Sequence, residues 1–122
     1  PAAVVPVVPE VLPVFDRAGF EERLMGDSDL VAEIAAGFLE DAPARLAALA
    51  EAVRKGEPAE AGRVAHTLKG ACANVGAVAM SALAGQIEAA GSARRMEKVS
   101  VLLPELENAF AVLSPRMKEV LP

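Results

Sequence analysis

The sequence predicts an all-α protein, an antiparallel four-helix bundle with a short additional helix near its N-terminus. Hydrophobic residues make up 53% of the chain, but aromatic residues only 3%, and tryptophan and tyrosine are absent. This alanine-rich mixture suits close helix packing better than a sheet, because strands favour β-branched and aromatic side chains. From Phe15 onward, apolar residues recur at spacings of three and four. A chain of 122 residues can bury one core.

The first 14 residues precede this helical pattern, and four of them are prolines: Pro1, Pro6, Pro9 and Pro13. Proline lacks an amide donor and biases the preceding residue toward extended geometry. We therefore expect residues 1–14 to form a linker or tail and residues 15–120 to form the domain. The leader and the missing initial methionine favour a module tethered within a longer protein, because tethering raises its effective concentration near a neighbouring domain.

The first two helices are separated by Gly26. A short helix is expected over residues 16–25, and Asp27 or Ser28 can cap a second one. Pro43 lies within the second helix, so we expect a kink or a split there. The apolar positions of this helix are Leu30, Ile34, Phe38, Ala42, Leu46, Leu49 and Val53.

The segment "KGEP", residues 55–58, ends the second helix and begins a third, with Pro58 in its first turn. The third helix is expected over residues 58–75, with Gly76 as its stop. A fourth, over residues 78–90, should end at Gly91.

Ser92 would then cap a fifth helix, which continues past Pro104. Its apolar stripe contains Met96, Val99, Leu103, Leu106, Phe110 and Leu113. The short connections between the four longer helices imply antiparallel neighbours, with the first helix across one end.

The third helix contains His66, the only histidine in the chain. At about 100° per residue, its apolar residues gather on one face, with Cys72 at the edge. These core positions are Ala61, Val64, Leu68 and Val75. The imidazole lies about 160° from Val64 and Leu68, so it should project into solvent. Its side of the helix also holds Gly62, Arg63, Lys69, Gly70 and Ala73.

Gly62 and Gly70 lie four residues to either side of His66. In a helix interior each glycine costs about 1 kcal/mol relative to alanine, so the pair needs a reason. They can be packing sites for a neighbouring helix, or they can admit a large partner to the imidazole. A neutral imidazole has a nitrogen lone pair that can take a phosphoryl group. Lys69 would then offset part of the added negative charge.

Composition and motifs exclude several other functions. The net charge is −5 and the basic residues are dispersed, which argues against nucleic acid as a partner. One cysteine and one histidine cannot build a zinc site alone. No apolar run is long enough to span a membrane. The glycine-containing segment "GEPAEAGR" lacks the Lys-Ser/Thr of a P-loop, so no nucleotide binding is expected.

The segment "AHTLKGACANVGA", residues 65–77, resembles the signature of histidine-containing phosphotransfer (HPt) domains, the four-helix modules of multistep two-component phosphorelays. The resemblance covers residues 15–115, including "FLEDAP" and "LLPELENAF". The His, Leu, Lys, Gly, Asn and closing Gly-Ala positions all match. The sequence departs at Ala71 and Cys72, where serine and alanine are frequent, so a hydroxyl contact there is absent.

This resemblance implies that His66 accepts a phosphoryl group from a receiver-domain aspartate and passes it to another. It places Lys69 near the phosphoryl oxygens and assigns steric access to Gly70. Glu88 matches a position that in some members hydrogen-bonds Nδ1 of the histidine. Such a bond would leave Nε2 as the nucleophile.

The expected partners are response-regulator receiver domains, docking around Gly62, Arg63, Ala73 and Asn74. The receiver would supply Mg²⁺, so the domain needs no cofactor of its own and has no autonomous catalytic activity. We expect the domain to be a cytoplasmic monomer. It would form the cytoplasmic end of a bacterial hybrid sensor histidine kinase that is bound to the membrane.

Two alternatives belong to other classes. One is a helical-bundle adaptor that is not phosphorylated, in which the groove beside His66 accepts a partner helix. The other is a metal or haem protein, which normally recruits several ligands from facing helices. A single histidine that faces outward disfavours the second.

Overall fold

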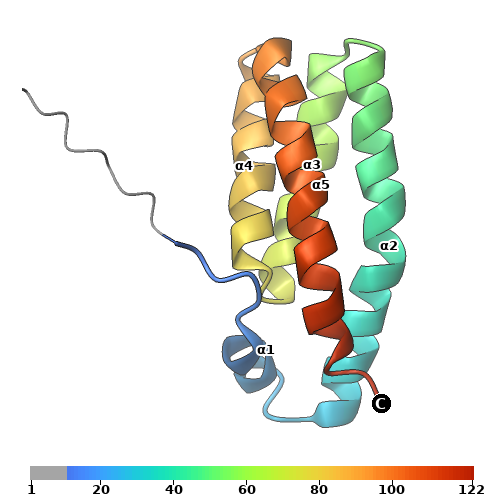
Figure 1. The fold of residues 1–122 in the computed structure, drawn as a ribbon, viewed down its shortest axis with the longest axis vertical. Helices are drawn as coiled ribbons and strands as arrows, with labels where there is room; N and C mark the ends of the chain where they lie inside the picture. Colours follow the sequence, from blue (N-terminus) through green and yellow to red (C-terminus); the bar gives the residue numbers. More distant parts are fainter. Residues whose placement is uncertain (1–10) are drawn as a thin grey trace, which may run out of the picture.

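The structure is a computed structural model that describes residues 11–122 and holds five helices in that range (Figure 1). They are α1 (Arg17–Arg23), α2 (Ser28–Arg54), α3 (Pro58–Asn74), α4 (Val78–Ser92) and α5 (Met96–Lys118). Helices α2 to α5 lie along one axis in alternating directions, and α1 lies at the end where α2 begins. The predicted all-α bundle is confirmed. Residues 1–10 of the predicted leader lie outside the described residues.

Side-chain caps and left-handed glycines set several helix ends. The Asp16 carboxylate accepts from the amide of Gly19, and Asp27 caps α2 by accepting from the amides of Asp29 and Leu30. Glycine takes a positive φ in three of the connections, at Gly26, Gly56 and Gly76. These local signals were readable in the sequence, which is why most predicted boundaries lie close to the observed ones.

Of the kink or split expected at Pro43, the split does not occur, because α2 is one continuous helix of 27 residues. Helix α5 likewise continues through Pro104 and Pro115. All three prolines are exposed, so their rings point away from the core. Burial of apolar residues on both sides of each proline outweighs the loss of one backbone hydrogen bond.

The predicted end of α4 is also wrong. Gly91 lies inside the helix, which continues to Ser92, and Ser92 does not cap α5. A Cβ at position 91 would lie 2.8 Å from the carbonyl oxygen of Pro58 and 2.9 Å from the nitrogen of Gly62. Gly91 therefore permits close contact between α3 and α4 and does not terminate a helix. The turn comes later, at Arg94, whose φ is 59°.

The core runs the length of the bundle, and no polar or charged residue of the described part of the chain is buried in it. All the predicted core positions of α3 are buried, and Cys72 is fully buried as well. The rings of Phe38 and Phe110, 6.3 Å apart, join α2 to α5. The largest fully buried side chains are Phe20, Leu49, Leu68, Met80, Ile87, Leu106, Leu113 and Met117.

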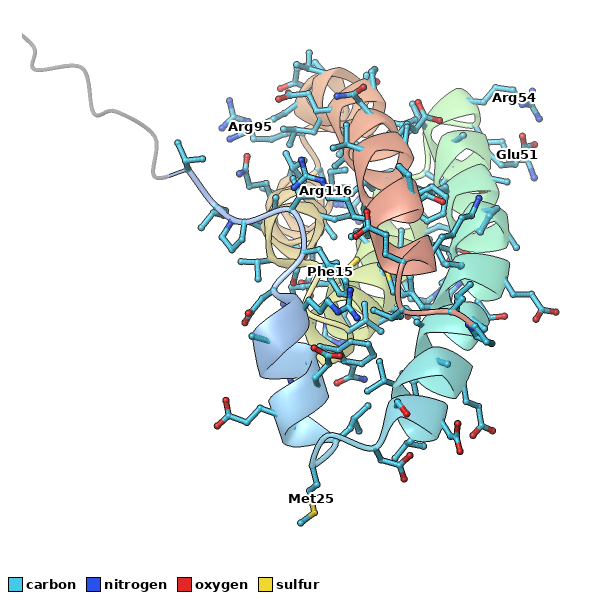
Figure 2. The ribbon with its side chains drawn as sticks, turned by 60° about the horizontal axis from the view of Figure 1, so that its bottom comes forward. Phe15, Met25, Glu51, Arg54, Arg95 and Arg116 are labelled. Carbon is cyan, nitrogen blue, oxygen red and sulfur yellow. The ribbon has the colours of Figure 1, made fainter. Side chains whose placement is uncertain are left out.

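The end of the bundle near α1 is closed by the chain that precedes this helix. The carbonyl of Pro13 accepts from the amide of Ala79, at 3.0 Å, and the amide of Asp16 donates to the carbonyl of Gly76, at 2.8 Å. Figure 2 shows Phe15 where the chain enters α1, and its ring lies 6.1 Å from that of Phe20. The last residues of the predicted leader thus pack on the bundle.

None of the helices within residues 11–122 combines the length and the apolar character that crossing a membrane requires.

Candidate functional site

His66 lies on the side of α3 opposite the core, and 67% of its side chain is exposed. The predicted exposure of the imidazole is therefore confirmed. Its Nδ1 lies 2.7 Å from Oε2 of Glu88, so the contact between these two residues is present. A carboxylate can only accept, so Nδ1 carries the proton and Nε2 of the neutral ring keeps its lone pair. Within residues 11–122, Nε2 makes no hydrogen bond.

The same carboxylate binds a cation. Oε1 of Glu88 lies 2.7 Å from Nζ of Lys69, so Glu88 bridges the imidazole and the ammonium group. The hydrogen bond from Lys69 and, after it, the one from His66 hold the pKa of Glu88 below its usual value. Lys69 is thus tied to α4 while remaining 42% exposed.

Two residues of α4 lie against Lys69, and sequence reasoning missed both. A Cβ at Gly85 would lie 3.3 Å from Cδ of Lys69, so the missing side chain leaves room for this stem. The hydroxyl of Ser81 donates to the carbonyl oxygen of Lys69 at 3.1 Å. A glycine inside an alanine-rich helix was the available signal at position 85.

An open hollow of about 530 Å³ lies beside the imidazole, between α3 and α4. Its lining consists of Ala59, Gly62, Arg63, His66, Thr67, Glu88, Gly91, Ser92 and Arg94. The N-terminal half of α3 and the C-terminal half of α4 form its walls. Arg94, in the α4–α5 turn, completes the lining.

The two glycines beside His66 differ in their surroundings. Gly62, expected on the exposed face, is buried, because α4 covers this flank of α3 and brings Gly91 against it. It is one of the residues that line the hollow. Gly70 is exposed, and a Cβ there would meet no atom within 4 Å. A Cβ at Gly62 would touch the backbone of α4, whereas a Cβ at Gly70 would extend into open space.

The remaining predicted docking residues are exposed but do not lie together. Arg63 lines the hollow and binds Glu60 through two hydrogen bonds, of 2.8 and 2.6 Å. Ala73 and Asn74 lie at the far end of α3, where their carbonyls each accept from Arg23 at 3.4 Å. Neither lines the hollow beside His66.

Cys72 is fully buried in the core. Burial raises the pKa of its thiol to about 12, so the thiol stays protonated and unreactive at neutral pH. Cys72 therefore packs as a small apolar residue of the core.

Residues 33–114 match the model of the Hpt domain family. The matched segment includes His66, Lys69 and Glu88, and it spans α3 and α4 completely. Comparisons with curated proteins and with solved structures found no match. Since the match covers most of the chain, this protein belongs to the Hpt domain family, whose members are phosphocarriers that interact with receiver domains in two-component phosphorelays.

Proposed function

We propose that His66 is the phosphoacceptor of this phosphocarrier. It receives a phosphoryl group from the phosphorylated aspartate of one receiver domain and passes it to the aspartate of another. The observation that carries the proposal is the orientation of the ring: Nδ1 is held by Glu88 at 2.7 Å, and the exposed Nε2 has no hydrogen-bond partner among the described residues.

In the forward step, the lone pair of Nε2 attacks the phosphorus of the aspartyl phosphate. The P–O bond to the aspartate breaks, and the carboxylate leaves with the bonding electrons. The ring then becomes positively charged, and the carboxylate of Glu88, which accepts the hydrogen bond from Nδ1, stabilises this charge. Because the transition state is loose, the main contributions of the protein are position and charge.

Lys69 supplies the nearest cation. Its ammonium group binds Glu88 before transfer and would turn toward the phosphoryl oxygens once they are attached to Nε2. Both positions lie on the exposed side of α3, so the movement requires only rotation of the lysine side chain. Gly70 leaves open the space beside this path.

The receiver domain would bring the Mg²⁺ that activates its own aspartyl phosphate. This chain is then a monomeric carrier with no bound nucleotide and no cofactor of its own. We further propose that it works in the cytoplasm as one module of a hybrid sensor kinase; the proline-rich residues 1–14 support a tethered arrangement.

The test is to mix the protein with receiver domains carrying labelled aspartyl phosphate. We expect label on the wild-type chain that is acid-labile and base-stable, and none on the His66→Gln variant. The variant should still bind the receiver, because glutamine changes little of the docking surface. Label on His66→Gln would place the phosphoryl group on another residue, and wild-type signalling by this variant would make the chain an adaptor. Either result contradicts the proposal.

A further inference from the structure

We propose that Arg94 is a docking residue that binds a carboxylate of the incoming receiver domain. This inference rests on the proposed function, since it concerns the partner of the same site. Arg94 has a left-handed backbone conformation that arginine rarely adopts.

The turn between α4 and α5 has the same hydrogen-bond pattern as the three other connections. The amide of Arg95 donates to the carbonyl of Ala90, as the amide of Ala77 donates to Cys72, that of Glu57 to Ala52 and that of Gly26 to Glu21. In each case the residue before the donor has a positive φ: Arg94 at 59°, Gly76 at 77°, Gly56 at 65° and Met25 at 58°. This is the helix-ending motif in which glycine is the usual residue.

Arginine at this position carries a steric cost that glycine would avoid. Folding therefore gives no reason for arginine here, and the hydrogen bonds of the turn do not involve its side chain. A residue kept in a costly backbone conformation is a reason to look for a use of its side chain.

The side chain of Arg94 lines the hollow that contains His66. The other arginine of this lining, Arg63, is neutralised by Glu60, and the neighbouring Arg95 lies 3.6 Å from Glu97. Arg94 makes no ion pair with any residue of the range 11–122. Its charge is therefore available at the edge of the phosphoacceptor site.

The charge of the hollow indicates what it receives. The chain as a whole has a net charge of −5, so an acidic surface would be repelled by most of it. Around the hollow, the one carboxylate of the lining, Glu88, is already paired with Lys69 and His66. Arg94 thus offers an uncompensated positive charge, which fits an aspartate or glutamate on the receiver face around the phosphorylated aspartate.

The Arg94→Gly variant distinguishes a role of Arg94 in docking from a role in folding, because the two roles predict different changes in KM and in melting temperature. Glycine relieves the left-handed backbone, so we expect a melting temperature equal to or above that of the wild type. Loss of the charge should raise the KM for the phosphorylated receiver about three- to tenfold, with kcat at saturating receiver unchanged. Raising the salt concentration should reduce the difference in KM between the variant and the wild type, because salt screens the attraction between Arg94 and the receiver.

Met25→Gly is the matched control. Among the described residues, Met25 and Arg94 are the two non-glycine residues with a positive φ. The φ of Met25 is 58°, and this residue is 93% exposed. Figure 2 shows it at the opposite end of the bundle from Arg95, the neighbour of Arg94. We expect a similar gain in melting temperature and no change in KM.

Two results would overturn the proposal. A wild-type KM for Arg94→Gly would show that the charge does not assist docking. A lower kcat with unchanged KM would place Arg94 on the phosphoryl group instead. Failure of the proposed function is distinct, because it would appear as a wild-type chain that takes no label. Receiver binding to Arg94→Gly and to the wild type, compared by calorimetry, would still test the docking role in that case.

Discussion

Glu88 accepts a hydrogen bond from Nδ1 of His66 at 2.7 Å and so joins α4 to α3 beside an exposed imidazole. The other oxygen of this carboxylate holds Lys69 at the same distance. The Glu88 side chain therefore selects the tautomer of the imidazole and holds the ammonium group of Lys69 beside it. Both effects depend on the carboxylate being ionised.

Replacing Glu88 by glutamine should slow phosphotransfer to His66 without abolishing it. The amide oxygen can still accept from Nδ1, but the amide carries no charge for the imidazolium or for Lys69. We expect a decrease of about tenfold in the single-turnover rate, as is typical when a residue that orients a functional histidine is changed. Glu51→Gln, which removes the carboxylate that binds Arg54 on α2, is the control and should transfer at the wild-type rate. Equal rates for wild type and Glu88→Gln would contradict this role.

The carboxyl group of Glu88 should titrate below its usual value of 4.5, because Lys69 and His66 stabilise the ionised form. A lowered pKa in the folded state means that the ion pairs stabilise the fold above the unfolded pKa and lose this effect as the pH falls through the folded one. Carbon-detected NMR can follow the side-chain carboxyl directly. A midpoint at or above 4.5 would show that the bridge is absent in solution.

Gly91→Ala should destabilise the fold. The added Cβ would lie within 3.0 Å of backbone atoms of Pro58 and Gly62, which cannot move aside as a flexible side chain can. We expect a loss of about 1–3 kcal/mol in the free energy of unfolding, measured in urea. Gly37→Ala, in the middle of α2 where a Cβ meets nothing within 4 Å, should stabilise the protein instead. A stable Gly91→Ala would mean that α3 and α4 are farther apart than described.

Gly70→Ala should have opposite effects on stability and on transfer. Its Cβ also meets nothing within 4 Å, so alanine should stabilise α3 by about 1 kcal/mol. The same methyl group fills the space beside His66 that a receiver domain needs, so the phosphotransfer rate should fall. Gly37→Ala again serves as the control, with a similar gain in stability and an unchanged rate. If Gly70→Ala transfers as fast as Gly37→Ala, steric access does not depend on Gly70.

Periodicity predicted the fold and the exposure of His66, because a helix of known period has one buried face, and the apolar residues of α3 mark it. The end of α4 and the turn that follows it depend on tertiary contacts, which residue spacing does not indicate. Gly91 has the same local signal as a helix stop, and only its packing against Gly62 on another helix shows otherwise. The left-handed Arg94 had no signal at all, since glycine is the residue expected there.

Lys69 illustrates a second limit of prediction from sequence. Its spacing from His66 placed it on the correct side of α3, but its pairing with Glu88 depends on the rotamers of two side chains. The room that Gly85 leaves for its stem depends on the register between α3 and α4. Neither quantity can be read from residue spacing.

We expect Nε2 of His66 to carry the phosphoryl group while Nδ1 stays bound to Glu88. The most direct test is the NMR spectrum of ¹⁵N-labelled protein after phosphorylation by a receiver domain, in which the single imidazole gives an unambiguous pair of ring nitrogens. The structure predicts coupling between phosphorus and Nε2, with Nδ1 still protonated. Phosphorus on Nδ1, or label on a carboxylate with the imidazole unchanged, would contradict it.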